Sequence, residues 1–141
     1  MDAMDAFIRD DRMIEHFGMQ VEAVEDGYVR VAATVREDFL NSHGVAHGAL
    51  IFAIIDVAFA IVVNAVVDAM GVQWSFNILR AAKPGDRVTG ECRLIHRGSR
   101  LQVVEYEARD QAGALLAKGQ ATAMSVKSGA ADSQRRRASE G

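Results

Sequence analysis

The spacing of hydrophobic positions changes along the chain and divides its first third into a helical and an extended part. Near the start, apolar residues at helical spacing alternate with charged ones, which predicts a short amphipathic helix ending at Gly18. Its apolar positions are Phe7, Ile8, Ile14 and Phe17. From residue 19 onward, apolar and polar positions alternate on both sides of an Asp-Gly pair at 26 and 27. This pattern predicts a β-hairpin over residues 19–35.

A long apolar run follows the loop REDFLNSHGVAHG. The run HGALIFAIIDVAFAIVV, residues 47–63, carries one charged residue, Asp56, and predicts a helix that begins near Gly48 and ends near Gly71. A membrane span is disfavoured, because an aspartate at mid-span costs roughly 2.5 to 3.5 kcal/mol and the flanks lack a lysine and arginine cluster. A helix that is apolar on all sides is then one buried inside a globular protein.

Three turn signals divide the rest of the chain into strands. KPGD at 83–86, RGS at 97–99 and DQAG at 110–113 separate four strand candidates over residues 73–82, 87–96, 100–108 and 114–126. Short connections favour an antiparallel meander. A sheet curled around one central helix would cover that helix, so we expect an α+β fold of this kind.

Composition narrows the class of protein. Half of the 141 residues are hydrophobic and a quarter are charged, which fits one globular domain over residues 1–126 with an N-terminal helix. The aperiodic end, residues 127–141, predicts a disordered tail, in which the three arginines at 135–137 are solvating charge. A net charge of -3 gives no basis for nucleic-acid binding. A lone cysteine, Cys92, and an acidic N-terminus without signal-peptide features predict a cytoplasmic protein.

The start of the long helix is the first candidate for chemistry. The first amides of a helix lack partners and point outward, so the Gly48 N–H can donate to a carbonyl oxygen that gains negative charge. Glycine also lets a ligand approach the backbone. Asp56 lies eight residues further on, about 12 Å along the same helix. A general base must come within ~3 Å of its proton, so one chain cannot readily use both groups. Two antiparallel helices side by side can, which predicts a two-fold homodimer with composite sites.

These residues carry a family resemblance. The run NSHGVAHGALIFAIIDVAFA, followed by FNILRAAKPGD, resembles the hotdog-fold acyl-CoA thioesterases, in the branch that includes phenylacetyl-CoA thioesterases. The resemblance covers roughly residues 15–126, and its most specific part is the spacing of Asn41, His47, Gly48 and Asp56. It implies a hotdog fold, a homodimer or a homotetramer of dimers, and hydrolysis of an acyl- or aryl-CoA to the acid and CoA. It implies no metal or redox cofactor.

The resemblance also implies roles for individual residues. The Asn41 side chain and the Gly48 amide would polarise the thioester carbonyl, and Asp56 of the partner would activate water or attack directly. Ser75 stands where the family has a Ser or Thr that holds this water. His47 would orient the loop through hydrogen bonds. The chain departs from the family where Ala49 replaces the second glycine of H-G-G, which leaves the acyl preference open.

Several alternatives stay open at this point. His43 and His47 have an i,i+4 spacing that could hold a metal, but no third ligand is evident. Asp56 could be a structural carboxylate at a dimer contact. Coenzyme A phosphates need cationic partners, for which the candidates are Arg80, Lys83, Arg97 and Arg100. Two other functions on the same fold are a non-catalytic acyl-CoA binding module and an enoyl-CoA hydratase.

Overall fold

The computed structural model describes residues 2–126, so the predicted tail over residues 127–141 lies outside the described residues. The helices are α1 (Ala3–Asp10), α2 (Arg12–His16), the 3-10 turn η1 (Glu37–Phe39) and α3 (Gly48–Asn64). The strands are β1 (Gln20–Glu25), β2 (Tyr28–Thr34), β3 (Ala69–Ile78), β4 (Arg87–Arg97), β5 (Leu101–Arg109) and β6 (Leu115–Ser125).

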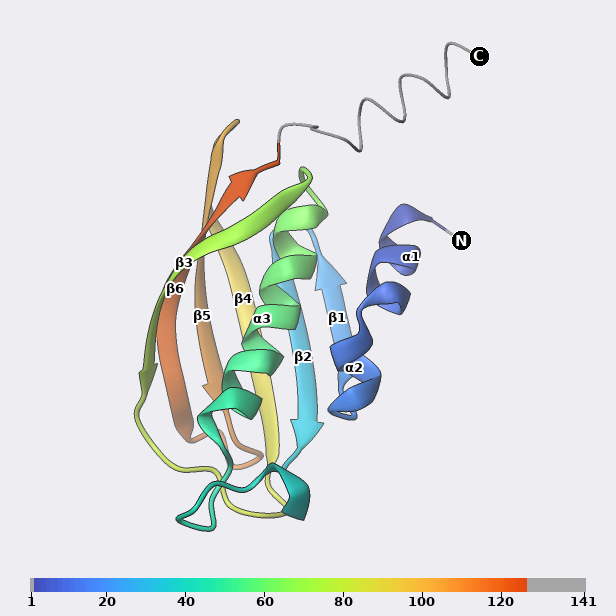
Figure 1. Ribbon diagram of the computed structural model, residues 1–141. Helices are drawn as coiled ribbons and strands as arrows, with labels where there is room; N and C mark the ends of the chain where they lie inside the picture. Colours follow the sequence, from blue (N-terminus) through green and yellow to red (C-terminus); the bar gives the residue numbers. More distant parts are fainter. Residues whose placement is uncertain (1, 127–141) are drawn as a thin grey trace.

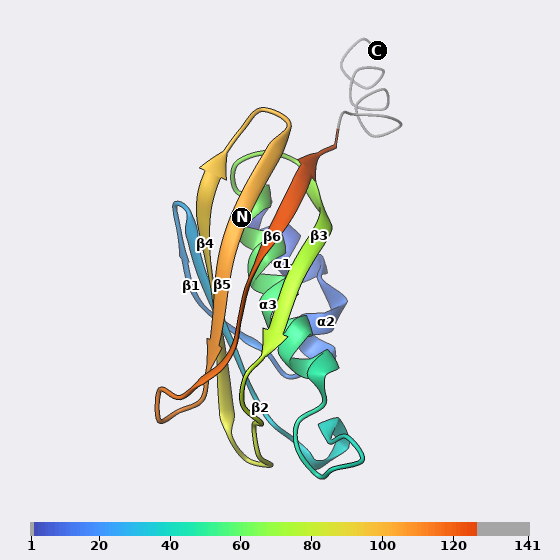
Figure 2. The same cartoon turned by 90° about the vertical axis from the view of Figure 1, so that its left-hand side faces the viewer.

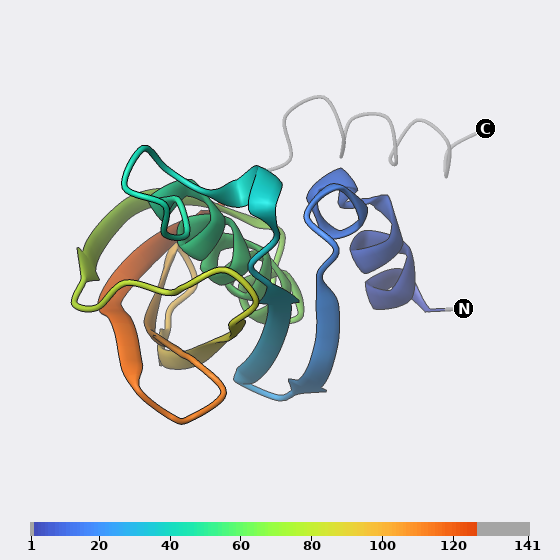
Figure 3. The same ribbon diagram turned by 90° about the horizontal axis from the view of Figure 1, so that it is seen from below.

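One antiparallel sheet wraps around one long helix. The six strands have the order β1-β2-β4-β5-β6-β3, and every neighbouring pair is antiparallel. The sheet curves around α3, while α1 and α2 lie beside α3 near β1 (Figures 1, 2 and 3). The prediction of an α+β fold with a sheet wrapped around a central helix is confirmed. Among the described residues, no helix is long and apolar enough to cross a membrane.

Most of the circumference of α3 is buried. Its large side chains, among them Leu50, Ile54 and Phe59, are almost completely removed from solvent. The predicted alternation in the hairpin is also confirmed, since Val29 and Val31 point into this core. The less buried positions of α3 follow a spacing of three or four residues and form one stripe along the helix. This open stripe consists of Ala49, Phe52, Ala53, Asp56, Ala60 and Asn64.

The helix ends earlier than the sequence predicts. The prediction placed its end near Gly71, but α3 ends at Asn64 and Gly71 belongs to β3. The reason lies in the Asn64 side chain, whose Nδ2 donates to the carbonyls of Ala60 and Ala69 at 2.8 and 3.1 Å. Its Oδ1 accepts from the Ala69 N–H at 3.1 Å. The side chain thus replaces backbone partners and turns the chain into β3.

Two further predictions are wrong in detail. The single N-terminal helix is two helices, because the Asp11 carboxylate accepts from the Met13 N–H at 3.0 Å and starts α2 afresh. The last four strands do not form a meander in chain order. Strand β3 pairs with β6 at the far edge of the sheet, and β2 takes the place next to β4.

The edge strand β3 is fastened to the sheet by a side chain from two strands away. The Tyr106 hydroxyl of β5 donates to the Ser75 carbonyl of β3. It passes over Gly119 of β6, where a Cβ atom would lie 2.7 Å from the Tyr106 oxygen and in collision with the Ser75 carbonyl. Only glycine leaves this path open.

We predict that Gly119→Ala lowers the free energy of unfolding by about 1 to 3 kcal/mol, because the added methyl group must displace backbone. Urea titration measures the change. The control is Gln120→Ala, the exposed neighbour on the same strand, for which we expect a change within about 0.5 kcal/mol. Equal effects of the two substitutions would contradict this account.

Candidate active site

The loop before α3 is held in a fixed shape by backbone hydrogen bonds. The His47 N–H donates to the Phe39 carbonyl and the Ala46 N–H donates to the Ala82 carbonyl, both at 2.8 Å. Leu40 and Ala46 form an isolated β-bridge. The loop that carries Asn41 and His43 therefore closes on itself and is tied to the chain segment between β3 and β4.

Asn41 is oriented by its own loop. Its Oδ1 accepts from the His43 N–H at 2.9 Å and from the Val45 N–H at 3.3 Å. This Asx-type arrangement uses the carbonyl oxygen of the side chain and fixes the direction of the amide. Within residues 2–126 the Nδ2 group makes no hydrogen bond, so it can donate to a ligand.

His47 caps α3 and leaves one amide free. Its Nδ1 accepts from the Ala49 N–H at 3.0 Å, while the Leu50 N–H donates to the His47 carbonyl. The Gly48 N–H finds no acceptor in the part of the chain that the structure describes. The first turn thus presents one unpaired donor at the positive end of the helix dipole. The His47 side chain thus caps the helix, and His43 contributes its backbone N–H to the Asn41 turn.

Asp56 lies in the middle of the open stripe and is half-buried. It has no hydrogen bond or ion pair within residues 2–126. Burial raises the pKa of its carboxyl above the ordinary value, and the nearby negative charge of Asp11 raises it further. A half-buried carboxylate without a partner lowers the stability of the folded chain. The contacts within one chain therefore do not explain why Asp56 is there.

The remaining predicted site residues are spread over the molecule. Ser75 lies on edge strand β3 and is exposed. Its neighbours Trp74 and Phe76 contact Phe52 of α3, so Ser75 faces the opposite side of the sheet. The structure therefore does not bring Ser75 and Asp56 of one protomer together.

The four candidate cations form two pairs at opposite ends of the sheet. Arg80 and Lys83 lie between β3 and β4, beside the loop that precedes α3. Arg97 and Arg100 lie at the other end of β4, a strand of 11 residues and about 35 Å. Arg97 is also paired with Asp26 at 2.8 Å. Of these four candidates, Arg80 and Lys83 thus lie at the end of the protomer where α3 begins.

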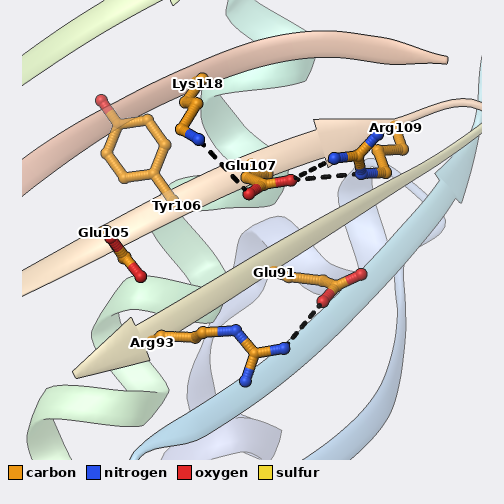
Figure 4. A pocket seen from close by; sticks show the side chains of 7 residues that line it. All are labelled: Glu91, Arg93, Glu105, Tyr106, Glu107, Arg109 and Lys118. Carbon is orange, nitrogen blue, oxygen red and sulfur yellow. Dashed lines mark hydrogen bonds and ion pairs between the residues drawn. The ribbon is translucent and has the colours of Figure 1, made fainter. Parts of the chain in front are cut away.

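Two hollows that the sequence did not reveal differ sharply in character. A small charged one, of about 100 Å³, lies on the outer face of the sheet (Figure 4). There Glu107 is paired with Arg109 at 2.7 Å and with Lys118 at 3.7 Å, and Glu91 lies 3.8 Å from Arg93. These charged side chains are paired with one another, as is typical of a sheet face exposed to solvent. The other hollow, of about 530 Å³, is lined mainly by apolar side chains and by Asp56.

No metal site emerges among residues 2–126, where no group of three His, Cys, Asp or Glu side chains is placed to hold an ion. In particular, His47 already uses Nδ1 for the helix cap. The groups assembled near the helix start are two hydrogen-bond donors, and the group on the open stripe is a carboxylate. This donor and acid set suits polarisation of a carbonyl and activation of water.

Comparison with known proteins identifies the family. The model of the thioesterase superfamily matches residues 43–117, more than half of the chain. The acyl-coenzyme A thioesterase PaaI of Escherichia coli is 27% identical over 75% of this chain and 76% of its own. A hypothetical thioesterase protein from Streptococcus pneumoniae, solved with coenzyme A, is 30% identical with a TM-score of 0.78, covering 86% of this chain and 95% of its own. A Streptococcus mutans protein bound to acetyl CoA is 31% identical with a TM-score of 0.72, covering 75% and 86%.

We predict that Asp56→Asn stabilises the protein at neutral pH. A carboxyl whose pKa is raised on folding contributes stability below its unfolded pKa, near 3.8, and this contribution is lost as pH rises through the higher folded value. The stability gain of the variant should therefore vanish in acid and grow toward neutral pH.

Urea unfolding at constant protein concentration over a pH series measures this gain. Asp10→Asn, at an exposed carboxylate of α1, is the control and should change stability by less than about 0.5 kcal/mol. A gain that is constant over the pH series would refute the assignment to the Asp56 charge.

Proposed function

Because this chain belongs to the thioesterase superfamily, we propose that it hydrolyses acyl- or aryl-CoA thioesters to the free acid and CoA. The predicted resemblance to the hotdog thioesterases and the predicted class of thioester hydrolase are thereby confirmed. The observation that carries the substrate and the mechanism is the unpaired Gly48 amide at the start of α3, together with the oriented Asn41 side chain in the loop that leads into this helix. Relatives solved with coenzyme A and acetyl CoA support the choice of a CoA thioester.

Asn41 and Gly48 would stabilise the oxyanion. As a hydroxide or carboxylate adds to the thioester carbonyl, the oxygen becomes negative and accepts from the Asn41 Nδ2 and the Gly48 N–H. Both donors are held in place before the substrate arrives, Asn41 by its loop and Gly48 by the capped helix. Donors fixed in advance need no reorganisation during the reaction.

Asp56 of the partner would supply the base or the nucleophile. As general base it takes a proton from water while the water oxygen attacks the carbonyl carbon; the C–S bond then breaks and CoA leaves as the thiolate, which is protonated. As nucleophile its carboxylate attacks the carbonyl carbon, the C–S bond breaks with CoA leaving as the thiolate, and water then hydrolyses the mixed anhydride to the free acid and the Asp56 carboxylate. Single-turnover incorporation of labelled oxygen into the Asp56 carboxylate separates the two routes.

A dimer supplies the second half of this site. The open stripe of α3 has small residues on both sides of Asp56, namely Ala53 and Ala60, which allow a second helix to approach closely. Beside it, β3 is an unpaired edge strand with exposed Met70 and Val72. We propose that two copies meet along this side, as a homodimer or a homotetramer of dimers. A lone, buried cysteine supports a reducing, cytoplasmic location.

Complementation between two inactive variants tests the composite site. We expect Asp56→Asn to lower thiol release at least about 100-fold and Asn41→Ala to lower it about 100- to 1000-fold. After subunit exchange, the mixture should recover about a quarter of wild-type activity, because half of the dimers are mixed and each has one intact site of two.

A mixture that stays as inactive as its components would show that each protomer holds a complete site. Native mass spectrometry of the mixture verifies that subunits have exchanged. Asp10→Asn mixed with either variant is the control for dilution, because it should keep about half of its activity whether or not subunits exchange. Wild-type binding of acyl-CoA without thiol release would favour the binding module, and loss of enoyl-CoA absorbance would favour the hydratase. The water-holding role of Ser75 stays a prediction, tested by Ser75→Ala.

Charge removal tests the binding of coenzyme A. We expect Arg80→Ala and Lys83→Ala to raise KM for acyl-CoA about three- to ten-fold with a small change in kcat, because they remove phosphate partners remote from the reacting carbonyl. Thioesters of pantetheine, which lack the nucleotide, should show no such change.

Arg97→Ala and Arg100→Ala provide the comparison from the other end of the sheet. Since that end belongs near the site only if the partner brings it there, we expect smaller effects from these two changes. A larger effect of Arg97 or Arg100 on KM would assign the phosphates to the partner's hairpin.

A further inference from the structure

The large hollow begins at the proposed catalytic carboxylate. It measures about 530 Å³ and lies between the second half of α3, the start of β3 and Phe7 of α1. Asp56 and Phe59 contribute from α3, and Gly71 and Trp74 contribute from β3. A substrate whose thioester reaches Asp56 can extend its acyl group into this hollow. The inference that follows therefore rests on the proposed function.

Trp74 owes its position to a bulge and a glycine. The pairing of β3 with β6 shifts by one residue between Gly71 and Gln73, which turns both Gly71 and Trp74 toward the helix side. The indole packs against Phe52 and Phe59, with ring centroids 5.6 and 5.5 Å away. A Cβ atom at Gly71 would collide with Cζ2 and Cη2 of the indole. Cζ2 is bonded to the ring carbon that bears Nε1, so the N–H group is adjacent to the part of the ring that faces Gly71.

The indole N–H is buried and has no acceptor within residues 2–126. Its aromatic neighbours Phe52 and Phe59 carry no acceptor atom. A buried donor without a partner costs free energy, and a ligand that supplies an acceptor recovers it. Trp74 thus adds an unpaired donor to the wall of the hollow, whose other polar side chains among the described residues are Asp56, Asn64 and Asp68.

We propose that Trp74 selects acyl groups that carry a hydrogen-bond acceptor, such as a ketone oxygen, on their far part. The apolar lining binds the hydrocarbon, and the Trp74 N–H donates to the acceptor. A site with an unpaired buried donor discriminates against the analogue that lacks the matching acceptor. Trp74 is then a specificity-determining residue for this hydrolase.

Matched substrate pairs test the proposal. Straight-chain acyl-CoAs from butyryl to decanoyl are each compared with the counterpart that has a ketone on the penultimate carbon. At the best chain length, we expect the wild-type protein to prefer the ketone by about ten-fold in kcat/KM, the effect of one hydrogen bond. In Trp74→Phe the ratio should fall to about one, whatever the absolute rates.

Two controls distinguish the effect of losing the N–H group from the effect of changing the ring and from a general loss of structure. Replacing Trp74 by benzothienylalanine keeps the ring shape and substitutes sulfur for the N–H, so it should also abolish the preference. Tyr28→Phe removes a ring-borne donor, bonded to Glu91, on the outer face of the sheet and should keep the preference. A wild-type ratio near one, or a ratio unchanged in the two Trp74 variants, overturns the proposal.

A binding measurement tests the hydrogen bond to Trp74 independently of turnover. Trp74 is the single tryptophan of the chain, so an ¹⁵N-labelled sample gives one indole N–H signal. In Asp56→Asn, the ketone ligand should move this signal downfield and the parent acyl-CoA should not. Equal shifts, or no shift with either ligand, overturn the selection by Trp74. Absence of thiol release from every wild-type substrate, with the downfield shift present, would overturn the proposed hydrolysis instead.

Discussion

Helix α3 is apolar around its whole circumference, and a single curved sheet covers only part of it. The burial of Leu50, Ile54 and Phe59 satisfies the part that faces the strands. What remains is the stripe with Asp56 at its centre. Apolar surface is unfavourable in contact with water, and an unpaired carboxylate is unfavourable where water is scarce. A partner that covers the apolar part of the stripe and pairs with the carboxylate would therefore stabilise it. The proposed second copy and substrate would do both.

The rigidity of the same helix sets the geometry of the reaction. Gly48 and Asp56 are fixed about 12 Å apart on one α-helix, which cannot bend enough to bring them to one carbonyl. The His47 cap holds the start of the helix while leaving the Gly48 N–H open. The distance that prevents one chain from acting alone becomes useful once two helices run antiparallel. In the proposed dimer, folding, association and catalysis would thus all depend on this one helix.

The sequence could predict features that follow from local patterns. The central helix, the hairpin and the three strands from β4 to β6 repeat their apolar positions with clear periods. The helix start was also readable, since His47 and Gly48 follow a polar loop directly. The end of α3 could not be predicted in this way, because Val66 and Val67 continue the apolar run. The helix is stopped by one side chain, Asn64, which forms hydrogen bonds across the turn to Ala69. The place of β3 at the far edge depends on non-local pairing, which no periodicity encodes.

The misjudged segment is the one that shapes the large hollow. If α3 continued to Gly71, residues 69–71 would be helical and could not line a space beside Asp56. By ending at Asn64, the chain gains a strand that returns alongside the helix, and the bulge after Gly71 turns Trp74 toward it. Of the proposed catalytic groups, Gly48 and Asp56 lie on the regular helix, where their spacing reveals them, and Asn41 lies in the loop before it. The proposed acyl-binding surface is formed by irregular features, namely a side-chain cap, a bulge and a glycine. Their effect depends on how β3 packs against α3, which the sequence does not reveal. This difference between the two parts of the site explains why a sequence motif predicts the reaction but does not predict which acyl group the protein accepts.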